Sequence, residues 1–178
     1  MIEIKPIHTQ DETLYAFVEN LMLTAFPIEE RRDTPQQREY TDHHPLFTSN
    51  IVLEDSIPVG MISYWNMGDF YYIEHFAIDP ERRNGGLGKR VLEALFEQVS
   101  HPIVLEVEEP TDEWSKRRIG FYQRLGFTLH EKPYYQPPYR PNGEGLPLLL
   151  MTHGQLDMEQ HFDRVVRTLH REVYGQDE

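Results

Sequence analysis

The chain of 178 residues contains no cysteine. Disulfide bonds, a thiol nucleophile and thiolate metal ligands are therefore excluded. The sequence also lacks an apolar run near the ~18 residues that a membrane-spanning helix needs. Its first residues, MIEIKPIHTQ, show neither the basic flank nor the apolar stretch of a signal peptide. We therefore expect a cytoplasmic protein with no membrane partner.

Positive charge is scarce. Lys and Arg together number 17 against 30 Asp and Glu, which gives a formal net charge of -13. Such a surface repels nucleic acid and anionic lipid, so we expect neither as a partner. A cationic substrate such as an amine suits this field, although an acidic surface also serves solubility alone. The nine histidines are scattered without a spacing such as H-E-x-x-H, so we predict no metal site.

Apolar periodicity predicts one α/β domain without repeats or low-complexity linkers. We expect a mixed, mostly antiparallel sheet flanked by helices over residues 1–152, with residues 153–178 as a C-terminal helical extension packed on the same domain. The expected strands are 2–7, three antiparallel strands between 46 and 80, 102–107, about 127–132 and 146–152. The expected helices are 9–25, 28–40, 87–99, about 112–125 and 156–175.

Several helix ends have sequence signals. Thr9 and Glu12 have the spacing of a capping box for the first helix. Pro35 is expected to break the helix over 28–40. The helix near 112–125 is expected to stop at Gly126 and to group Trp114, Arg118, Phe121, Tyr122 and Leu125 on one side. The proline-rich segment KPYYQPPYRPNGEG, residues 132–145, is expected to form a loop.

The glycines in DPERRNGGLGKR, residues 79–90, lie between a predicted strand and a strongly amphipathic helix. The first turn of a helix presents backbone N–H groups to an anion, and glycine lets a phosphate approach closely. Arg82, Arg83 and Lys89 add positive charge there. A Walker loop would need Ser or Thr after Lys89, but Arg90 follows, and a dinucleotide fingerprint would follow the first strand. The alternative is a surface turn whose glycines only serve positive φ.

The pattern R-x-x-G-x-G, formed by Arg83, Gly86 and Gly88, resembles the acetyl-CoA signature of the GNAT superfamily of N-acetyltransferases. Downstream, Phe121-Tyr122 and Gly126-Phe127 resemble the same superfamily's F/L-Y-x-x-x-G-F motif. The resemblance covers about residues 2–151 and is strongest over 73–127. Ser115 stands where the family commonly has asparagine. FPIEERR and YYQPPYR also resemble a bacterial branch of these enzymes.

The resemblance implies direct acetyl transfer from acetyl-CoA to a primary amine of a small molecule or peptide, in a ternary complex. The cofactor would lie where parallel strands 71–78 and 103–107 splay apart. It would be held by the backbone of Phe76, Ala77, Ile78, Arg83, Asn84, Gly85, Gly86, Leu87, Gly88 and Lys89. Two alternatives are a catalytically silent acyl-CoA sensor and an interaction protein with the same fold. A homodimer is left open.

The resemblance also implies catalytic roles. Tyr122 matches the family's general acid, and Glu106 matches a position that supplies the base in some members. Glu74 is a second candidate base, because an acidic residue within a buried strand needs a partner or a role. The alternatives are a structural role for Tyr122 and, for one of the carboxylates, an ion pair with Arg117, Arg118 or Arg124. Tyr134, Tyr135 and Tyr139 could form an aromatic wall for the acceptor, and we assign Tyr135 and Tyr139 to substrate binding.

Overall fold

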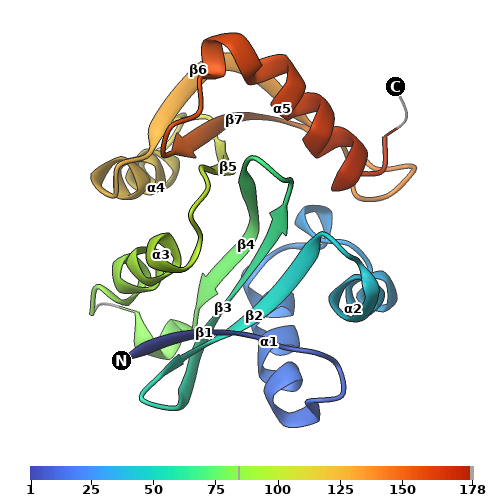
Figure 1. Cartoon of the computed structure of the whole chain (residues 1–178). Helices are drawn as coiled ribbons and strands as arrows, with labels where there is room; N and C mark the ends of the chain where they lie inside the picture. The colour runs from blue at the N-terminus through green and yellow to red at the C-terminus, as the bar shows by residue number, and fades with distance from the viewer. Residues whose placement is uncertain (84, 177–178) are drawn as a thin grey trace. The chain divides into compact units, whose positions relative to one another are not determined.

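The computed structural model describes residues 1–83 and 85–176. The chain forms two compact units, and Figure 1 shows the elements of each. The first unit comprises Met1–Asn66 and Tyr72–Ser100, and the second comprises Met67–Tyr71 and His101–Glu178. Among the described residues, none of the helices combines the length and apolarity needed to cross a bilayer.

The strands of the first unit follow the order β1-β2-β3-β4. They are β1 (Ile2–Pro6), β2 (Phe47–Glu54), β3 (Ile57–Asn66) and β4 (Tyr71–Ile78). β2 pairs antiparallel with both β1 and β3. Asp55 and Ser56 join β2 to β3 with φ angles of 49° and 69°, which is the left-handed backbone of a tight hairpin. The three strands predicted between residues 46 and 80 are therefore confirmed.

The described residues of the first unit form the α-helices α1 (Glu12–Ala25), α2 (Thr34–His43) and α3 (Leu87–Gln98), and short 3-10 turns at Ile28–Glu30 and Pro80–Arg82. α1 exists because its apolar residues recur at helical spacing and form one stripe. Tyr15, Val18 and Met22 on this stripe belong to one buried cluster with Ile51 of β2 and Met61 of β3. Burial of that stripe fixes α1 on the sheet.

Two predictions about these helices are wrong. Thr9 does not cap α1, because its backbone N–H and its hydroxyl both donate to the carboxylate of Asp42 on α2. The predicted helix over 28–40 instead begins at Thr34. Pro35 lies in the first turn of α2, where the missing N–H breaks no helical hydrogen bond, so it starts the helix rather than breaking it.

The strands of the second unit follow the order β5-β7-β6, with both neighbouring pairs antiparallel. They are β5 (Ile103–Glu108), β6 (Thr128–Gln136) and β7 (Leu146–His153), accompanied by α4 (Glu113–Arg124) and α5 (Met158–Glu172). α5 buries Phe162, Val165 and Leu169 along one stripe, as its sequence predicts. Gly126, with φ of 96°, ends α4 as expected.

β6 is longer than predicted. It continues through Pro133 to Gln136, so Tyr134 and Tyr135 lie on a strand rather than in a loop. The register shifts between His130 and Tyr134, and β6 is the last strand in its unit's order, which are the conditions under which a strand accommodates proline. The predicted grouping on α4 is also partly wrong, because Trp114 is 63% exposed.

Gly60 on β3 tests the close approach of β3 to β4. A Cβ at this position would lie 2.7 Å from the carbonyl oxygen of Ala77, which is backbone and cannot move aside cheaply. We expect Gly60→Ala to lower the free energy of unfolding by about 1–3 kcal/mol, as overpacking does. Urea denaturation measures this. Gly120→Ala, inside α4 with only the end of the Arg124 side chain nearby, should be neutral or stabilising; equal effects of the two changes would contradict the explanation.

Candidate functional site

The turn before α3 leaves backbone N–H groups available. Gly86 precedes α3 in the left-handed conformation, with φ of 66° and ψ of 20°, and no side chain of the described residues caps the helix. The first intrahelical bond runs from the Arg90 N–H to the Gly86 carbonyl, so the amides of residues 87–89 come before it. A Cβ on Gly85 or Gly86 would meet no atom of the residues that the structure describes within 4 Å. This open turn at a positive helix end fits a phosphate group.

Cationic side chains surround the turn. Arg82, Arg83 and Lys89 are exposed. The Arg83 Nε donates to the carbonyl of Ile78, 3.4 Å away, and so links the turn to the end of β4. Arg90 instead forms an ion pair with Glu54 at 2.5 Å.

The other predicted cofactor contacts lie on β4, where Phe76 and Ile78 are half-buried and Ala77 is buried. Asn84 lies outside the described residues. The turn and the end of β4 thus bring together most of the predicted cofactor-binding positions.

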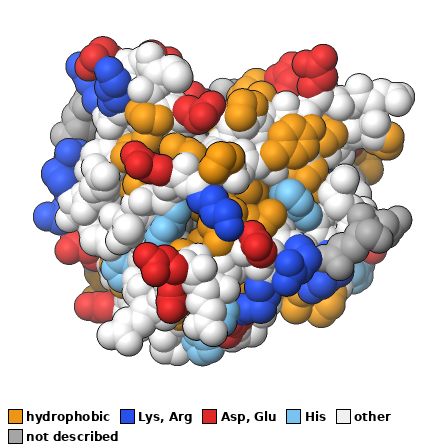
Figure 2. Space-filling model, turned by 90° about the horizontal axis from the view of Figure 1, so that it is seen from above, with side chains coloured by type: hydrophobic (Ala, Val, Ile, Leu, Met, Phe, Trp, Pro, Cys, Tyr) orange, Lys and Arg blue, Asp and Glu red, His pale blue; other side chains and the backbone are white. Residues whose placement is uncertain are grey.

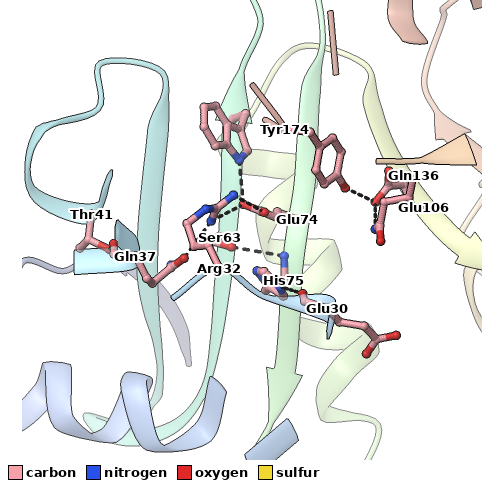
Figure 3. A network of polar contacts seen from close by, with 11 residues as sticks. Glu30, Arg32, Gln37, Thr41, Ser63, Glu74, His75, Glu106, Gln136 and Tyr174 are labelled. Carbon is pink, nitrogen blue, oxygen red and sulfur yellow. Dashed lines mark hydrogen bonds and ion pairs between the residues drawn. The ribbon is translucent and has the colours of Figure 1, made fainter. Parts of the chain in front are cut away.

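Glu74, also on β4, forms a fully buried ion pair with Arg32. The side chains are 0% and 2% exposed, and the two guanidinium nitrogens lie 2.6 and 3.1 Å from the two carboxylate oxygens. The Trp65 indole N–H donates to the same carboxylate at 2.9 Å (Figure 3). The Gln37 side-chain oxygen accepts a further bond from Arg32 at 2.8 Å. Arg32 also lies over the ring of Tyr40, with 4.8 Å to its centroid.

Electrostatics fix the charge of Glu74. Burial by itself raises its pKa, but the Arg32 charge, helped by His75 and by hydrogen bonds from Arg32 and Trp65, outweighs burial and holds the pKa at about 2. Glu74 therefore stays ionised, and its charge is compensated. Its ion-pair partner is Arg32 of the FPIEERR segment, not one of the arginines near Tyr122 that the sequence offered.

The segment FPIEERR, residues 26–32, is attached to β4 at a second point. The His75 Nε2 donates to the Glu30 carbonyl at 2.8 Å, and the His75 ring meets the Phe26 ring edge-on at 4.7 Å (Figure 3 shows the hydrogen bond). Burial lowers the pKa of His75, which favours the neutral ring. Arg32 of this segment therefore lies in the interior and not on a solvated face.

Glu106 on β5 lies in a different kind of environment. Its carboxylate accepts hydrogen bonds from the Tyr134 hydroxyl, from the Gln136 side-chain amide at 2.8 Å and from the Tyr174 hydroxyl at 2.7 Å (Figure 3 shows the last two). Glu106 pairs with Leu150 of β7, while Tyr134 and Gln136 pair with residues 148 and 146 of that strand. Positions two apart share a face, so the register brings both β6 side chains to the face of Glu106.

These three donors are neutral, in contrast to the guanidinium that meets Glu74. Burial, and then the Glu106 charge and hydrogen bond, raise the pKa of Tyr134. Its hydroxyl therefore remains protonated and continues to donate. The two candidate bases thus differ in chemistry, because Glu74 is neutralised by a cation whereas Glu106 is oriented by phenol and amide groups.

Tyr122 is buried on α4, and its ring contacts those of Phe121 and Phe127. Burial raises its pKa, although Arg118 opposes the shift through its charge and a hydrogen bond. The hydroxyl is therefore protonated near neutral pH, as a general acid must be.

Ser115, which replaces the family's asparagine, caps α4. The Ser115 N–H donates to the Asp112 carboxylate at 2.7 Å, and the Asp112 N–H donates to the Ser115 hydroxyl at 3.2 Å. This reciprocal pair is a capping box. The residue thus holds the beginning of the helix that carries Tyr122.

The three tyrosines of the predicted aromatic wall, Tyr134, Tyr135 and Tyr139, make different contacts. Tyr135 is 52% exposed, and its carbonyl accepts from the His170 Nε2 at 2.8 Å. The Tyr139 ring lies edge-on to the Tyr174 ring at 5.3 Å. Tyr134 instead points to Glu106. Sequence reasoning missed Tyr174 and Gln136, since nothing in the local pattern ties either residue to β5.

Charge on the surface is mixed. In Figure 2, Lys and Arg side chains on the visible face lie among Asp and Glu side chains. Within the described part of the chain, no group of three or more histidines and carboxylates could hold a metal ion.

The helix turn before α3 is typical of a protein that binds a phosphate-bearing cofactor. The model of the acetyltransferase (GNAT) family matches residues 14–127. The chain belongs to this family, which confirms the predicted family, the α/β fold class and the prediction of an acyltransferase.

Solved structures agree. A protein from Bacteroides thetaiotaomicron that is assigned to the GNAT family has 51% sequence identity and a TM-score of 0.97, over 98% of this chain and 99% of that chain. Arabidopsis thaliana Naa50 in complex with the bisubstrate analogue CoA-Ac-MVNAL has 16% identity and a TM-score of 0.61, over 86% and 99%. An aminoglycoside 6'-N-acetyltransferase complexed with coenzyme A has 16% identity and a TM-score of 0.63, over 87% and 99%. These two show the fold alone. No protein with curated function has a significantly similar sequence.

The pair of Arg32 and Glu74 predicts a pH dependence of stability. The pKa of Glu74 is about 2 in the folded protein and near its ordinary value of 4.5 when unfolded, so its contribution is complete above pH 4.5 and is lost as the pH falls towards 2. We expect a loss on the order of 3 kcal/mol in the free energy of unfolding from this group. Denaturant titrations between pH 2 and 6 measure it.

Glu74→Gln removes the titrating group and should remove this part of the pH dependence. Glu93→Gln, at an exposed position of α3, provides the control and should leave the dependence in place. A Glu74→Gln protein with the same pH dependence as the wild type would contradict the assigned ion pair.

Proposed function

We propose that the protein transfers the acetyl group of acetyl-CoA to a primary amine. The observation that carries this proposal is the open turn at Gly85 and Gly86 before α3, within the range matched by the family model. In this proposal the amides of residues 85–89, with Arg83 and Asn84, hold the pyrophosphate. The amides of Phe76, Ala77 and Ile78 hold the pantetheine arm and polarise the thioester carbonyl.

Bound acetyl-CoA would supply a thioester as the acyl donor, and the chain's own groups would then move protons. Glu106 binds the ammonium group of the acceptor and accepts its proton, directly or through water, which leaves a neutral amine able to attack. The Tyr122 hydroxyl would donate a proton to the departing thiolate and would regain one from the nitrogen, which loses a proton as the amide forms. Glu74 was the second candidate base, but accepting a proton would require it to give up its interaction with Arg32, so we favour Glu106.

The acceptor in this proposal is a small molecule or a peptide with a primary amine. The net charge of -13 favours a cation, and Tyr135 and Tyr139 are proposed to contact the acceptor. Two proteins of the same fold support this class, since one is solved with a peptide-containing bisubstrate analogue and the other is an aminoglycoside acetyltransferase.

The cofactor turn is tested by Gly85→Glu. Among the described residues, no atom lies within 4 Å of an added Cβ, so the fold should tolerate the change. The new carboxylate should repel the pyrophosphate. Acetyl-CoA at about 100 times its Kd should stabilise the wild type by roughly 2.7 kcal/mol, and this shift should disappear in the variant. Thermal unfolding with and without acetyl-CoA measures both.

Gly85→Gln is the matched control, because it has the same size without the charge. It should retain more of the stabilisation than Gly85→Glu. A wild type without any shift would overturn acetyl-CoA binding, and equal losses in both variants would overturn the electrostatic explanation.

Tyr122→Phe tests the general acid. We expect kcat to fall roughly 10- to 100-fold, at or below the low end of the ~10²–10⁴-fold contribution of a positioned general acid, because a thiolate is a fair leaving group. The shift with acetyl-CoA should persist, since the phenyl ring keeps its contacts. Release of free CoA thiol with a panel of primary amines measures kcat. An unchanged kcat would contradict the role, and a wild type that binds acetyl-CoA without turnover would favour the silent sensor.

A further inference from the structure

We propose that Tyr174, just beyond the end of α5, is a positioning residue that sets the orientation of the Glu106 carboxylate. This inference rests on the proposed function, in which Glu106 receives the proton of the acceptor amine. Tyr174 would act through Glu106 without touching either substrate. The C-terminal segment is then a part of the catalytic apparatus and not only an extension of the fold.

Two donors meet on one oxygen of Glu106. The Tyr174 hydroxyl and the Gln136 amide both donate to Oε1, at 2.7 and 2.8 Å, while the Tyr134 hydroxyl donates to Oε2. The donors come from β6 and from the residue pair that follows α5, so the carboxylate is held from more than one direction. These hydrogen bonds fix both the position of the carboxylate group and the orientation of its plane.

Tyr174 itself is held firmly. It is 9% exposed, and the preceding Val173 and Leu169 are 3% and 0% exposed. The Val173 N–H donates to the Leu169 carbonyl at 3.0 Å, which continues the helical pattern to the residue before Tyr174. The Tyr139 ring packs against the Tyr174 ring. Burial of the α5 stripe therefore fixes the place from which the phenol donates.

The chemistry of the donor explains why a phenol suits this position. A glutamate side chain has three rotatable bonds and reaches a reactive geometry only part of the time unless other groups hold it. A cation such as Arg32 would hold the carboxylate but would also neutralise it. A neutral phenol orients the carboxylate while leaving its negative charge available to attract an ammonium group.

The donors also lie outside the part of the chain that defines the family. The family model matches residues 14–127, whereas Tyr134, Gln136 and Tyr174 all follow that range. The orientation of Glu106 is therefore set by residues outside the range that the family model matches.

A double-mutant cycle tests the inference. The variants are Tyr174→Phe, Glu106→Gln and the double variant, each assayed for CoA thiol release with acetyl-CoA and a panel of putrescine, tyramine, kanamycin and a short peptide with a free N-terminus. We expect Tyr174→Phe to lower kcat about tenfold, the scale of a hydrogen bond to a charged group, with the KM for acetyl-CoA within about twofold. In the Glu106→Gln background the same change should alter kcat by less than about twofold, because it acts through Glu106.

Two control variants separate positioning from stability. Leu21→Ala should lower the thermal midpoint by removing packing on α1 but should retain the wild-type kcat. Tyr15→Phe removes another buried phenol hydroxyl, on α1, and should also retain kcat. Equal losses of kcat in Tyr174→Phe and Leu21→Ala would overturn the inference.

The remaining outcomes are distinct. If the wild type is active and the effects of Tyr174→Phe and Glu106→Gln multiply in the double variant, the positioning role is wrong while the proposed function stands. If the wild type acetylates none of the amines, the proposed function fails and this inference fails with it.

Discussion

The first unit depends on one buried ion pair. Arg32 and Glu74 are almost completely removed from water, and removing either charge alone from such a pair leaves the other without compensation, at a cost of about 3–5 kcal/mol. The pair joins residues 42 positions apart and is reinforced by Trp65, Gln37 and the ring of Tyr40. It holds residues 26–32 against β4 next to the residues proposed to bind the cofactor. Its geometry is therefore a condition for the shape of that end of the strand.

The same ion pair distinguishes Glu74 from Glu106, the two acidic residues that the sequence predicts as candidate bases. Glu74 has a pKa of about 2 and a cationic partner, so it is a poor proton acceptor as long as the pair is intact. Glu106 receives hydrogen bonds from two phenols and an amide, which orient a carboxylate without supplying a compensating positive charge.

Local signals in the sequence predicted the family and most of the elements, because periodicity and turn residues act over a few positions. The glycine turn before α3, the hairpin at Asp55-Ser56 and the end of α4 at Gly126 are examples. Interactions over long separations escaped prediction. Thr9 meets Asp42 rather than capping α1, Arg32 meets Glu74, and Tyr174 meets Glu106 across 68 positions. No periodicity encodes such pairs, since they arise only when packing brings distant elements together.

The difference between local signals and long-range contacts also concerns the specificity for the acceptor. The match to the family model ends at residue 127, and it includes the turn before α3 and Tyr122. The side chains that surround Glu106 come from β6, from the position after α5 and, through the ring of Tyr139, from the segment after β6. Relatives could therefore share donor chemistry while differing in these later residues. Because the acceptor amine must meet the carboxylate in the orientation that these residues impose, the part of the chain beyond the family motifs is where we expect acceptor choice to be determined.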